Sequence, residues 1–372
     1  MLSLIIPYRN RDVVRVTNCL NSLAAQTHTN FEVVLVDNGS DVLISSQINE
    51  LASKYNFCTY IYLNTCGLIW NKSYAINVGV NIAKGNTIMI VDVDLLFAPN
   101  FLQQIATLNF DNRYYNYKCL YLPQNYAIEH YNWAVDNSAQ LSNSGLSTGL
   151  VIASKKDFEN INGYDEYYQG WGLEDDDFCN RLNATGLTQT YLNHQQYVSL
   201  HQYHPVSYAN VPTTWYTHLL QYTHATTTIK RNIDGAGALA KYTNRLCMTE
   251  AYDALEKIVF TPKEFLSITG FNGIYTAFFN LKSNTALQLN YLQPLALSEN
   301  STSFKIKNSL LTQIIKNKII SNYPTLLAHS YLTTEKLHEF MINFISLNRS
   351  QLLDYYIDYV PNKSLIIKLV KK

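Results

Sequence analysis

The sequence predicts an α/β fold with a mainly parallel sheet, and two patterns carry this prediction. In the first half of the chain, short fully apolar runs of strand type alternate with runs that have helical spacing. Strands that are apolar throughout must be covered on both faces, which is the rule for parallel sheets flanked by helices. In such sheets ligands bind beyond the carboxyl ends of the strands, so the residues that follow each strand are the candidates for a site.

The expected elements follow one another in that order. Leu2–Tyr8 (LSLIIPY) and Phe31–Asp37 (FEVVLVD) are buried-strand patterns, and residues 12–26 between them have helical spacing with Asp12 as the N-cap. The other elements expected in this half are a strand at 59–63, a helix at 73–83 and a strand at 87–97. We therefore look for chemistry after the strands, at residues 7–11, 37–40 and 92–94.

A change in composition near residue 225 predicts a domain boundary. Residues 226–245 have the composition of a linker or mobile loop, no glycine follows Gly273, and residues 305–320 and 335–347 are amphipathic helical patterns. The expected organisation is a catalytic domain at 1–225, with halves at about 1–98 and 99–225, and a mostly helical subdomain at 226–372.

The global composition bounds the class of protein. The chain has 372 residues, 47% of them hydrophobic, and 28 basic residues balance 28 acidic ones, which argues against a nucleic-acid partner. Six cysteines without C-x-x-C spacing indicate free thiols in a reducing compartment. Without a signal-peptide pattern or a long apolar segment, the expected location is the cytoplasm. The basic region after residue 301 leaves two alternatives, a solvated helical surface or peripheral contact with the inner face of a membrane. The oligomeric state is left open.

Two short patterns have the chemistry of a metal site. Asp92 and Asp94 (VDVD) stand at i and i+2 at the end of a strand, where a divalent ion holding a diphosphate would neutralise them. His201 and His204 (HQYH) have a spacing that lets two imidazoles face one Mn²⁺ or Zn²⁺ ion. The alternatives are two solvated acids at a strand-to-loop transition and two surface histidines.

The ends of the first two strands carry residues that suit a nucleotide. Arg9 and Arg11 follow the first strand and could meet phosphates. Asp37 ends the second strand and could accept an N–H of a nucleobase. The alternatives are a surface turn for the arginines, and a helix N-cap or Asx turn for Asp37.

The stretch GWGLEDDDF, residues 170–178, concentrates four acids behind a tryptophan between two glycines. Acids are favoured in the first turn of a helix, and Asp177 can pair with Arg181 at i,i+4. This account explains one or two acids but not all four. Trp171 between glycines has the character of a mobile aromatic platform or lid.

Taken in order, these segments resemble the GT-A fold glycosyltransferases. The start of the chain, from LSLIIPYRNR to VVLVDNGSD, looks like the family 2 inverting transferases. The segments IPYRNR, NKSYAINVG, DVDLLF and GWGLEDDDFCNRL resemble the β-1,4-galactosyltransferases and the related bacterial chondroitin-type polymerases. The resemblance spans about residues 2–205.

The resemblance implies roles for individual residues. Asp94 would bind Mn²⁺ or another divalent metal, with His201 and His204 standing where the family has a methionine and a histidine. Asp175 would be the general base, with Glu174 as the other catalytic carboxylate. The acceptor would meet Glu174, Asp176, Trp171 and Gly172. The residues implied for the UDP-sugar donor are Pro7, Tyr8, Arg9, Arg11, Asp37, Lys72, Asn77, Asp92 and Trp171.

Two departures from the family concern the substrates. Leu173 stands where the family has a glycine, and Gln169 where it has a tryptophan, so acceptor recognition is expected to differ. Leu146 falls near the aromatic wall that helps to select galactose, and a smaller residue there could admit a 2-acetamido group. The donor sugar is therefore open.

The resemblance implies a metal-dependent, inverting transfer of a hexose or N-acetylhexosamine from a UDP-sugar. The acceptor would be a hydroxyl of an oligosaccharide or lipid-linked glycan, in the synthesis of a surface polysaccharide. Two alternatives belong to other classes, a catalytically inactive nucleotide- or carbohydrate-binding module and a sugar nucleotidyltransferase. The absence of glycine from IIPYRNRD counts against the latter, because those enzymes carry a glycine-rich phosphate loop after the first strand.

Overall fold

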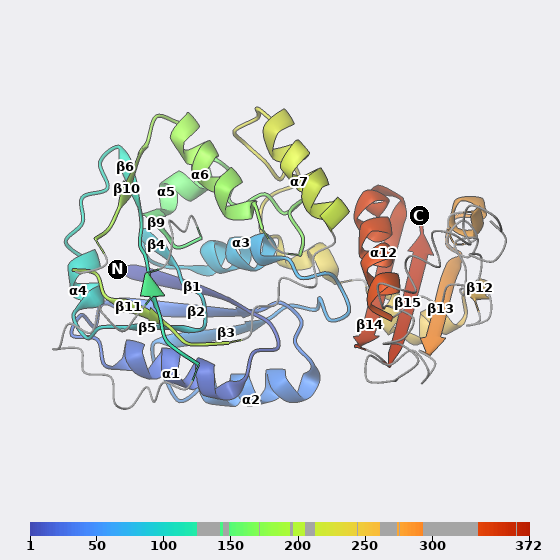
Figure 1. Cartoon of the computed structure of the whole chain (residues 1–372), viewed down its shortest axis with the longest axis horizontal. Helices are drawn as coiled ribbons and strands as arrows, with labels where there is room; N and C mark the ends of the chain where they lie inside the picture. Colours follow the sequence, from blue (N-terminus) through green and yellow to red (C-terminus); the bar gives the residue numbers. More distant parts are fainter. Residues whose placement is uncertain are drawn as a thin grey trace, which may run out of the picture. The chain divides into compact units, whose positions relative to one another are not determined.

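The computed structural model divides the chain into two compact units (Figure 1). Unit 1 comprises Met1–Cys66, Trp70–Ala209 and Tyr216–Thr243, and unit 2 comprises Gly67–Ile69, Asn210–Trp215 and Asn244–Lys372. The residues that the structure describes are 1–124, 142–143, 149–170, 172–193, 196–204, 213–243, 245–260, 274, 276–292, 334–361 and 363–372.

A seven-stranded sheet forms the centre of unit 1, in the order β10-β6-β9-β4-β1-β2-β3. Strands β1 to β4 run parallel to one another, β10 runs parallel to β6, and β9 is antiparallel to both of its neighbours. The mainly parallel sheet is as predicted. The strands are β1 (Leu2–Tyr8), β2 (Phe31–Asp37), β3 (Cys58–Tyr62), β4 (Thr87–Ile90), β6 (Arg113–Asn116), β9 (Val151–Ser154) and β10 (Thr188–Tyr191).

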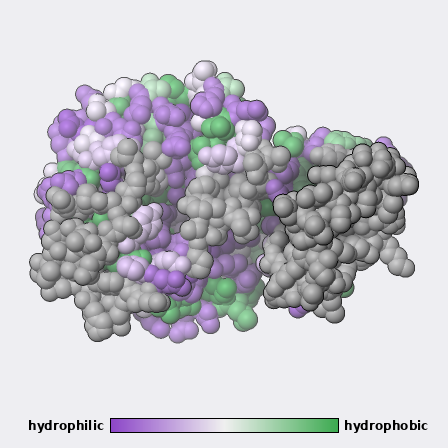
Figure 2. Space-filling view, viewed as in Figure 1, coloured by the Kyte–Doolittle hydropathy of each residue, from purple (hydrophilic) through white to green (hydrophobic). Residues whose placement is uncertain are grey.

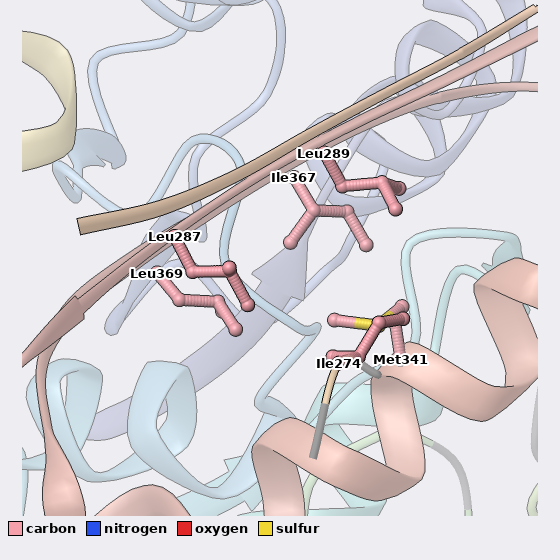
Figure 3. Close-up of a pocket in the computed structure, with 6 residues that line it drawn as sticks. All are labelled: Ile274, Leu287, Leu289, Met341, Ile367 and Leu369. Atoms are coloured by element: carbon pink, nitrogen blue, oxygen red, sulfur yellow. The ribbon is translucent and has the colours of Figure 1, made fainter. Parts of the chain in front are cut away.

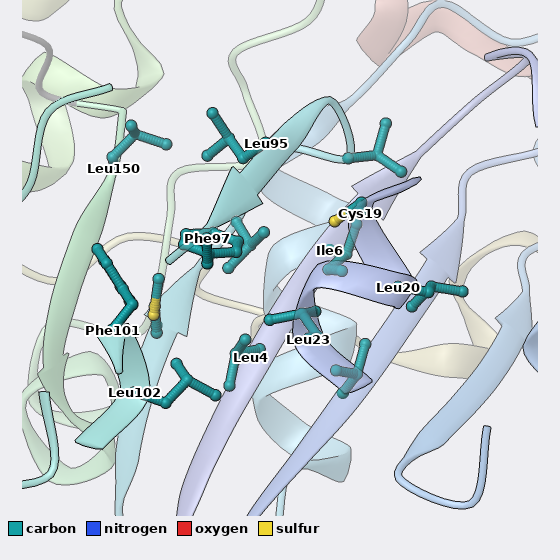
Figure 4. Packing of buried hydrophobic residues seen from close by; sticks show 14 of the residues in the cluster. Leu4, Ile6, Cys19, Leu20, Leu23, Leu95, Phe97, Phe101, Leu102 and Leu150 are labelled. Carbon is teal, nitrogen blue, oxygen red and sulfur yellow. The ribbon is translucent and has the colours of Figure 1, made fainter. Parts of the chain in front are cut away.

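Helices cover both faces of this sheet, as its apolar strands require. Along β1 alternate side chains enter opposite layers: Leu4 and Ile6 join the cluster under α1 and α2, and Ile5 joins the cluster under α3 and α6. Figure 4 shows the first cluster, in which Leu20 and Leu23 of α1 pack against β1. The helices of unit 1 are α1 (Val13–Ala24), α2 (Val42–Ala52), α3 (Lys72–Ile82), α4 (Phe101–Ile105), α5 (Lys155–Asn160), α6 (Glu174–Ala184) and, from Tyr216 onward, α7 (Thr213–Ala225).

The caps explain where two of these helices begin. The Asp12 carboxylate accepts a hydrogen bond from the Arg15 backbone N–H (2.9 Å), which confirms the predicted N-cap of α1. The Asn71 side chain accepts a bond from the Tyr74 N–H (2.8 Å) and so fixes Lys72 as the first residue of α3. This cap places the Lys72 side chain at the carboxyl edge of the sheet.

The strand predicted at 87–97 is wrong as a single element. It divides into β4 and β5 (Leu95–Phe97), with a turn between them that is closed by a hydrogen bond from the Leu95 N–H to the Asp92 carbonyl (3.1 Å). The reason is that β5 leaves the central sheet and pairs antiparallel with β11 (Ser199–His201). A second sheet results, in the order β5-β11-β7-β8, with β7 at Leu120–Tyr121 and β8 at Ser142–Asn143.

The structure also corrects the predicted linker after residue 225. Residues 226–243, which we call the strap, belong to unit 1 and are held to it by buried ion pairs of Arg231. The compact unit therefore ends at Thr243, and not near 225. A short 3₁₀ helix, η4 (Leu239–Tyr242), ends the strap.

Unit 2 is built around a four-stranded sheet in the order β12-β13-β15-β14, where mostly helices were expected. The tyrosines of β14 and the β-branched residues of β14 and β15 favour strands, which explains the sheet. The predicted helix at 335–347 is confirmed as α12 (Thr334–Leu347), whereas the one at 305–320 lies outside the described residues. The other elements are β12 (Lys257–Phe260), β13 (Ala286–Leu292), β14 (Leu352–Val360), β15 (Ser364–Lys371), α8 (Glu250–Asp253), η5 (Leu246–Met248) and η9 (Arg349–Gln351).

The core of unit 2 lies between its sheet and α12. Figure 3 shows Leu287 and Leu289 of β13 beside Ile367 and Leu369 of β15, all pointing toward Met341 of α12. The space between them is lined by aliphatic and thioether groups, so it is packing and offers no group that would orient a polar ligand.

Three further observations concern the cysteines, the length of the helices and the surface of unit 1. Each of the six cysteines carries a reduced thiol, as predicted. None of the helices in the described ranges is both long and apolar enough to cross a bilayer. On the face drawn in Figure 2, hydrophilic residues cover most of the described surface of unit 1, with hydrophobic ones scattered among them.

Candidate active site

The parallel register of β1 and β2 brings Tyr8 beside Asp37 at the carboxyl edge of the sheet. Asp37 is fully buried, and its Oδ1 accepts a hydrogen bond from the Ser40 N–H (2.7 Å) while Oδ2 accepts one from the Tyr60 hydroxyl (2.7 Å). Burial raises the pKa of Asp37. The turn alternative is thus realised at Asp37, and its contact with a nucleobase stays a prediction.

The loop after β1 is tied down by the residues predicted for the donor. Pro7 is a buried strand residue opposite Val36, and the Tyr8 hydroxyl donates to the Arg11 carbonyl (2.6 Å). The positive charge of Arg9 acts on Asp37 and that of Arg11 acts on Asp94, which places both guanidinium groups near the carboxyl edge. Both arginines are partly exposed there.

Three predicted metal ligands come together because β5 pairs with β11. This pairing sets His201 opposite Leu95, directly after Asp94, and the Gln202 N–H donates to the Asp94 carbonyl (2.8 Å). Asp94 Oδ1 lies 3.5 Å from His201 Nε2, and Asp94 Oδ2 lies 3.1 Å from His204 Nε2. One potential ligand atom from each residue lies within 4.8 Å of the other two.

The chemistry of this group fits a divalent transition metal. Asp94 Oδ1 and His201 Nδ1 are buried and make no hydrogen bond with the described residues. Burial lowers the pKa of His201, which keeps its imidazole neutral and able to donate a lone pair. Burial alone would raise the pKa of Asp94, but the hydrogen bond to His204 and the positive charge of Arg11 help to lower it, so the carboxylate is ionised. One carboxylate and two imidazoles suit Mn²⁺ or Zn²⁺.

Lys72 connects the Asp-x-Asp turn to the acidic motif. Its Nζ lies 3.3 Å from Asp175 Oδ2, 3.6 Å from Asp92 Oδ1 and 3.9 Å from Glu174 Oε1. Burial lowers the pKa of Lys72, but the three carboxylates together raise it by more than burial lowers it. The net shift of the pKa is upward, so the ammonium stays charged. One cation therefore neutralises acids that come from two distant parts of the chain.

The four acids of the motif divide between different surroundings. Glu174 is buried, and this burial with the adjacent Asp175 raises the pKa of Glu174 to about 7. Asp175 faces Lys72 with Oδ2, while its Oδ1 is buried without a hydrogen bond among the described residues. Asp176 is exposed, and Asp177 pairs with Arg181 (2.7 Å) as predicted. Only Glu174 and Asp175 therefore face the lysine.

Gly149 is a site residue that sequence analysis missed. A Cβ at this position would lie 2.7 Å from Asp175 Oδ2, so glycine leaves room for the carboxylate. In the sequence, Gly149 is a single glycine at the start of an apolar strand. This pattern is too common to mark a residue as part of a site.

The backbone before α6 explains what the unusual Leu173 does. Leu173 occupies the N-cap position of α6 in the left-handed conformation (φ 70°), directly after Gly172 (φ 101°). A left-handed residue other than glycine costs about 1–2 kcal/mol. A glycine would adopt this conformation without that cost, so Leu173 carries backbone strain at the start of α6. Trp171 lies outside the described residues.

Asn77, which was predicted to contact the donor, makes hydrogen bonds with the loop before the acidic motif. It is 2% exposed; its amide donates to the Tyr164 carbonyl (2.8 Å) and Glu166 Oε1 (3.0 Å) and accepts from the Tyr164 N–H (2.8 Å). These bonds use its side chain to hold the loop before the acidic motif. A contact between Asn77 and the donor stays a prediction.

Comparisons with known proteins identify the class. Residues 3–159 match the family model "Glycosyl transferase family 2", and residues 129–205 match "N-terminal domain of galactosyltransferase". With the mixed sheet and its flanking helices, these matches confirm the expected resemblance: the N-terminal part of the chain has the GT-A fold and is similar to glycosyltransferases.

Three curated proteins are similar to parts of this chain, and two of them are β-1,4-galactosyltransferases. The chain is 39% identical over 72 residues to human β-1,4-galactosyltransferase 2, covering 19% of this chain and 18% of that protein. It is 32% identical over 125 residues to β-1,4-galactosyltransferase 7 of Drosophila melanogaster, covering 32% of this chain and 33% of that protein. It is 28% identical over 124 residues to Glycosyltransferase GlyG of Streptococcus pneumoniae serotype 4, covering 32% and 40%.

One solved structure that this chain matches is the catalytic domain of Drosophila β1,4-galactosyltransferase 7 in complex with xylobiose. It shares 20% sequence identity with this chain at a TM-score of 0.34, covering 51% of this chain and 63% of that one. The chain spans less than half the length of the curated relatives that it matches.

Proposed function

We propose that the protein transfers a hexose or N-acetylhexosamine from a UDP-sugar to a hydroxyl of a glycan, with inversion at the anomeric carbon and with the help of a divalent metal. The observation that carries this proposal is the position of Lys72, within 4 Å of carboxylates from both the Asp-x-Asp turn and the acidic motif. Asp92, proposed to bind the donor, and Glu174 and Asp175, proposed to meet the acceptor, therefore lie around the same lysine. Synthesis of a surface polysaccharide is the proposed context.

In the proposed reaction Asp175 is the general base. Its carboxylate removes the proton of the acceptor hydroxyl while that oxygen forms a bond to the anomeric carbon. The bond from the anomeric carbon to the diphosphate oxygen breaks, and its electron pair leaves with UDP. Lys72 Nζ, 3.3 Å from Asp175 Oδ2, would hold this carboxylate in place beside the acceptor hydroxyl.

Two sets of residues are proposed to neutralise the negative charge of the leaving diphosphate. Asp94, His201 and His204 would hold Mn²⁺, which neutralises negative charge as it develops. Arg9 and Arg11, at the same edge, would contact the phosphates with fixed positive charge. Glu174 is suited to hydrogen-bond an acceptor hydroxyl, because with a pKa of about 7 it can donate as well as accept near neutral pH.

The substitution Asp175→Asn tests the proposal. The amide preserves the size of the side chain and cannot act as a base, so transfer is expected to fall by about 100-fold or more. UDP binding in the presence of Mn²⁺ should stay near the wild-type value. Asp111→Asn, an exposed aspartate on the loop before β6, is the matched control. Near-normal transfer by Asp175→Asn would refute the base assignment.

A screen of UDP-Gal, UDP-GalNAc, UDP-Glc and UDP-GlcNAc with Mn²⁺ separates the proposal from its alternatives. UDP release that rises with a glycan acceptor supports a transferase and identifies the donor. Binding of UDP without turnover would favour an inactive binding module. Formation of a UDP-sugar from UTP and a sugar phosphate would favour a nucleotidyltransferase.

A further inference from the structure

The strap, residues 226–243, lies beyond the segment that matches the glycosyltransferase families, yet it holds the acidic motif. Its Arg231 is 6% exposed and stands between two carboxylates: Nε lies 3.3 Å from Asp165 Oδ2, and Nη2 donates to Asp177 Oδ1 (3.2 Å). Asp165 lies in the loop before the motif and Asp177 in the first turn of α6. One guanidinium therefore spans both ends of the segment that contains Asp175.

Asp177 is shared between two arginines. Its Oδ2 accepts from Arg181 Nε (2.7 Å) within α6, and its Oδ1 meets Arg231. Arg181 in turn donates to the carbonyls of Ile161 (3.1 Å) and Gly163 (2.8 Å). The buried charges thus connect the strap, the loop at 161–165 and the start of α6 in one network.

Two further strap residues hold the same loop. Asn232 donates to the carbonyls of Asn162 (2.8 Å) and Tyr164 (2.7 Å) and accepts from the Glu166 N–H (3.0 Å). Lys241 forms an ion pair with Glu166, which is 3% exposed and also accepts from the Gly237 N–H (2.5 Å). A buried carboxylate whose hydrogen bonds and charge are satisfied restrains the segment that carries it, so we expect the strap to limit motion of the loop at Glu166.

A glycine allows the strap to reach this position. Gly237 has φ 63°, and a Cβ there would lie 2.5 Å from the backbone carbon of Asn77 in α3. The Tyr74 hydroxyl of α3 donates to the Ala238 carbonyl (2.9 Å). The strap is therefore fastened to α3, which carries Lys72, as well as to α6, which carries Asp175.

We infer that Arg231 is a positioning residue for the proposed transfer: by joining Asp165 to Asp177 it fixes the first turn of α6, so that Asp175 meets Lys72 and the acceptor hydroxyl. This inference rests on the proposed function. It adds a requirement for residues 226–243 that the family resemblance, which ends near residue 205, does not contain.

The test uses Arg231→Gln in the full chain. We expect kcat for transfer to fall by about 10-fold or more, because small errors in the position of a base are costly. The affinity for UDP with Mn²⁺ should stay within about 3-fold of the wild type, because Arg231 has no contact with Asp94, His201 or His204 among the described interactions. Arg231→Lys, whose single ammonium can meet one carboxylate at a time, should give an intermediate kcat.

Lys230→Gln is the matched control, since Lys230 is the exposed basic residue next to Arg231 and should keep wild-type kinetics. Rates are divided by the concentration of sites that bind UDP, so that loss of folded protein does not imitate loss of positioning. If Arg231→Gln does not fold, kcat per UDP-binding site is measured for Arg231→Lys instead, and a decrease supports the inference. A wild-type kcat in the folded variants would overturn the inference.

Hydrogen exchange separates this inference from the proposed function. In Arg231→Gln the amides of residues 174–181 should exchange faster than in the wild type, while those of β1 and β2 should not change. If the wild type shows no transfer but this exchange difference appears, the proposed function fails and the positioning by Arg231 stands. Unchanged exchange with unchanged kcat would overturn the positioning alone.

Discussion

Neighbouring residues of the acidic motif have different chemistry because each side chain enters a different environment. Glu174 is buried beside Asp175, Asp176 is exposed, and Asp177 is neutralised by two arginines. Burial of a carboxylate without a full counter-charge favours its protonated form. The composition of the motif alone does not distinguish these residues; their burial does.

Glu174 should make the stability of the protein fall as the pH rises. Its pKa is raised from 4.5 to about 7 in the folded state, so its contribution is fully present below about pH 4.5 and is lost as the pH rises through 7. Over this window the wild type should lose up to about 3 kcal/mol of unfolding free energy relative to Glu174→Gln. Urea denaturation of both proteins at several pH values measures the difference. A difference that does not vary with pH would contradict the raised pKa.

At the scale of elements, the metal site depends on one strand pairing. Asp94 ends the turn before β5, and His201 ends β11, so the antiparallel β5–β11 ladder sets the distance between them. His204 follows in the same segment, three residues on. The ligands thus come from two elements about a hundred residues apart in the chain, and the pairing of these elements positions them.

His204→Ala should weaken the binding of Mn²⁺ by about 10-fold or more, at least as much as the loss of an outer-shell partner costs in known metal sites. Titration followed by the electron paramagnetic resonance signal of free Mn²⁺ measures this affinity. His28→Ala is the control, because His28 precedes β2 and so lies toward the amino end of the parallel strands, away from the carboxyl edge. Equal affinities of His204→Ala and the wild type would exclude His204 as a ligand.

At the scale of the whole molecule, the compact unit that holds the site extends past the predicted boundary. Asp165, Glu166 and Asp177 are buried carboxylates whose cationic partners include residues of the strap. Removing one partner of such a pair typically costs about 3–5 kcal/mol, because the remaining charge stays buried. The ion pairs of the strap are therefore expected to contribute to the free energy of unfolding of unit 1.

Limited proteolysis distinguishes a buried strap from a mobile linker. Trypsin cleaves after Arg231 and Lys241, and both bonds should be cut at least about 100-fold more slowly in the native chain than in the urea-unfolded chain. Asp165→Asn combined with Asp177→Asn should speed this cleavage, because Arg231 then loses both charged partners. If these two bonds are the first to be cut in the native wild type, residues 226–243 form a linker as the composition suggested.

The sequence by itself determined the features that depend on local spacing. The apolar runs at Leu2–Tyr8 and Phe31–Asp37, the cap at Asp12 and the pair Asp177–Arg181 all appear where they were predicted. Periodicity and capping involve residues a few positions apart, so they leave a readable pattern in the chain. The order of the motifs also sufficed to recognise the family resemblance.

Only the tertiary structure decided which distant charges meet. Lys72 faces Asp175 across about a hundred residues of sequence, Asp94 meets His201 through a strand pairing, and Arg231 joins Asp165 to Asp177. Such contacts leave no periodic pattern in the sequence. A single charged residue looks the same in the sequence whether its side chain is solvated or buried. Their partners are fixed by the packing of helices on the sheet, and that packing made a presumed linker part of the candidate active-site unit.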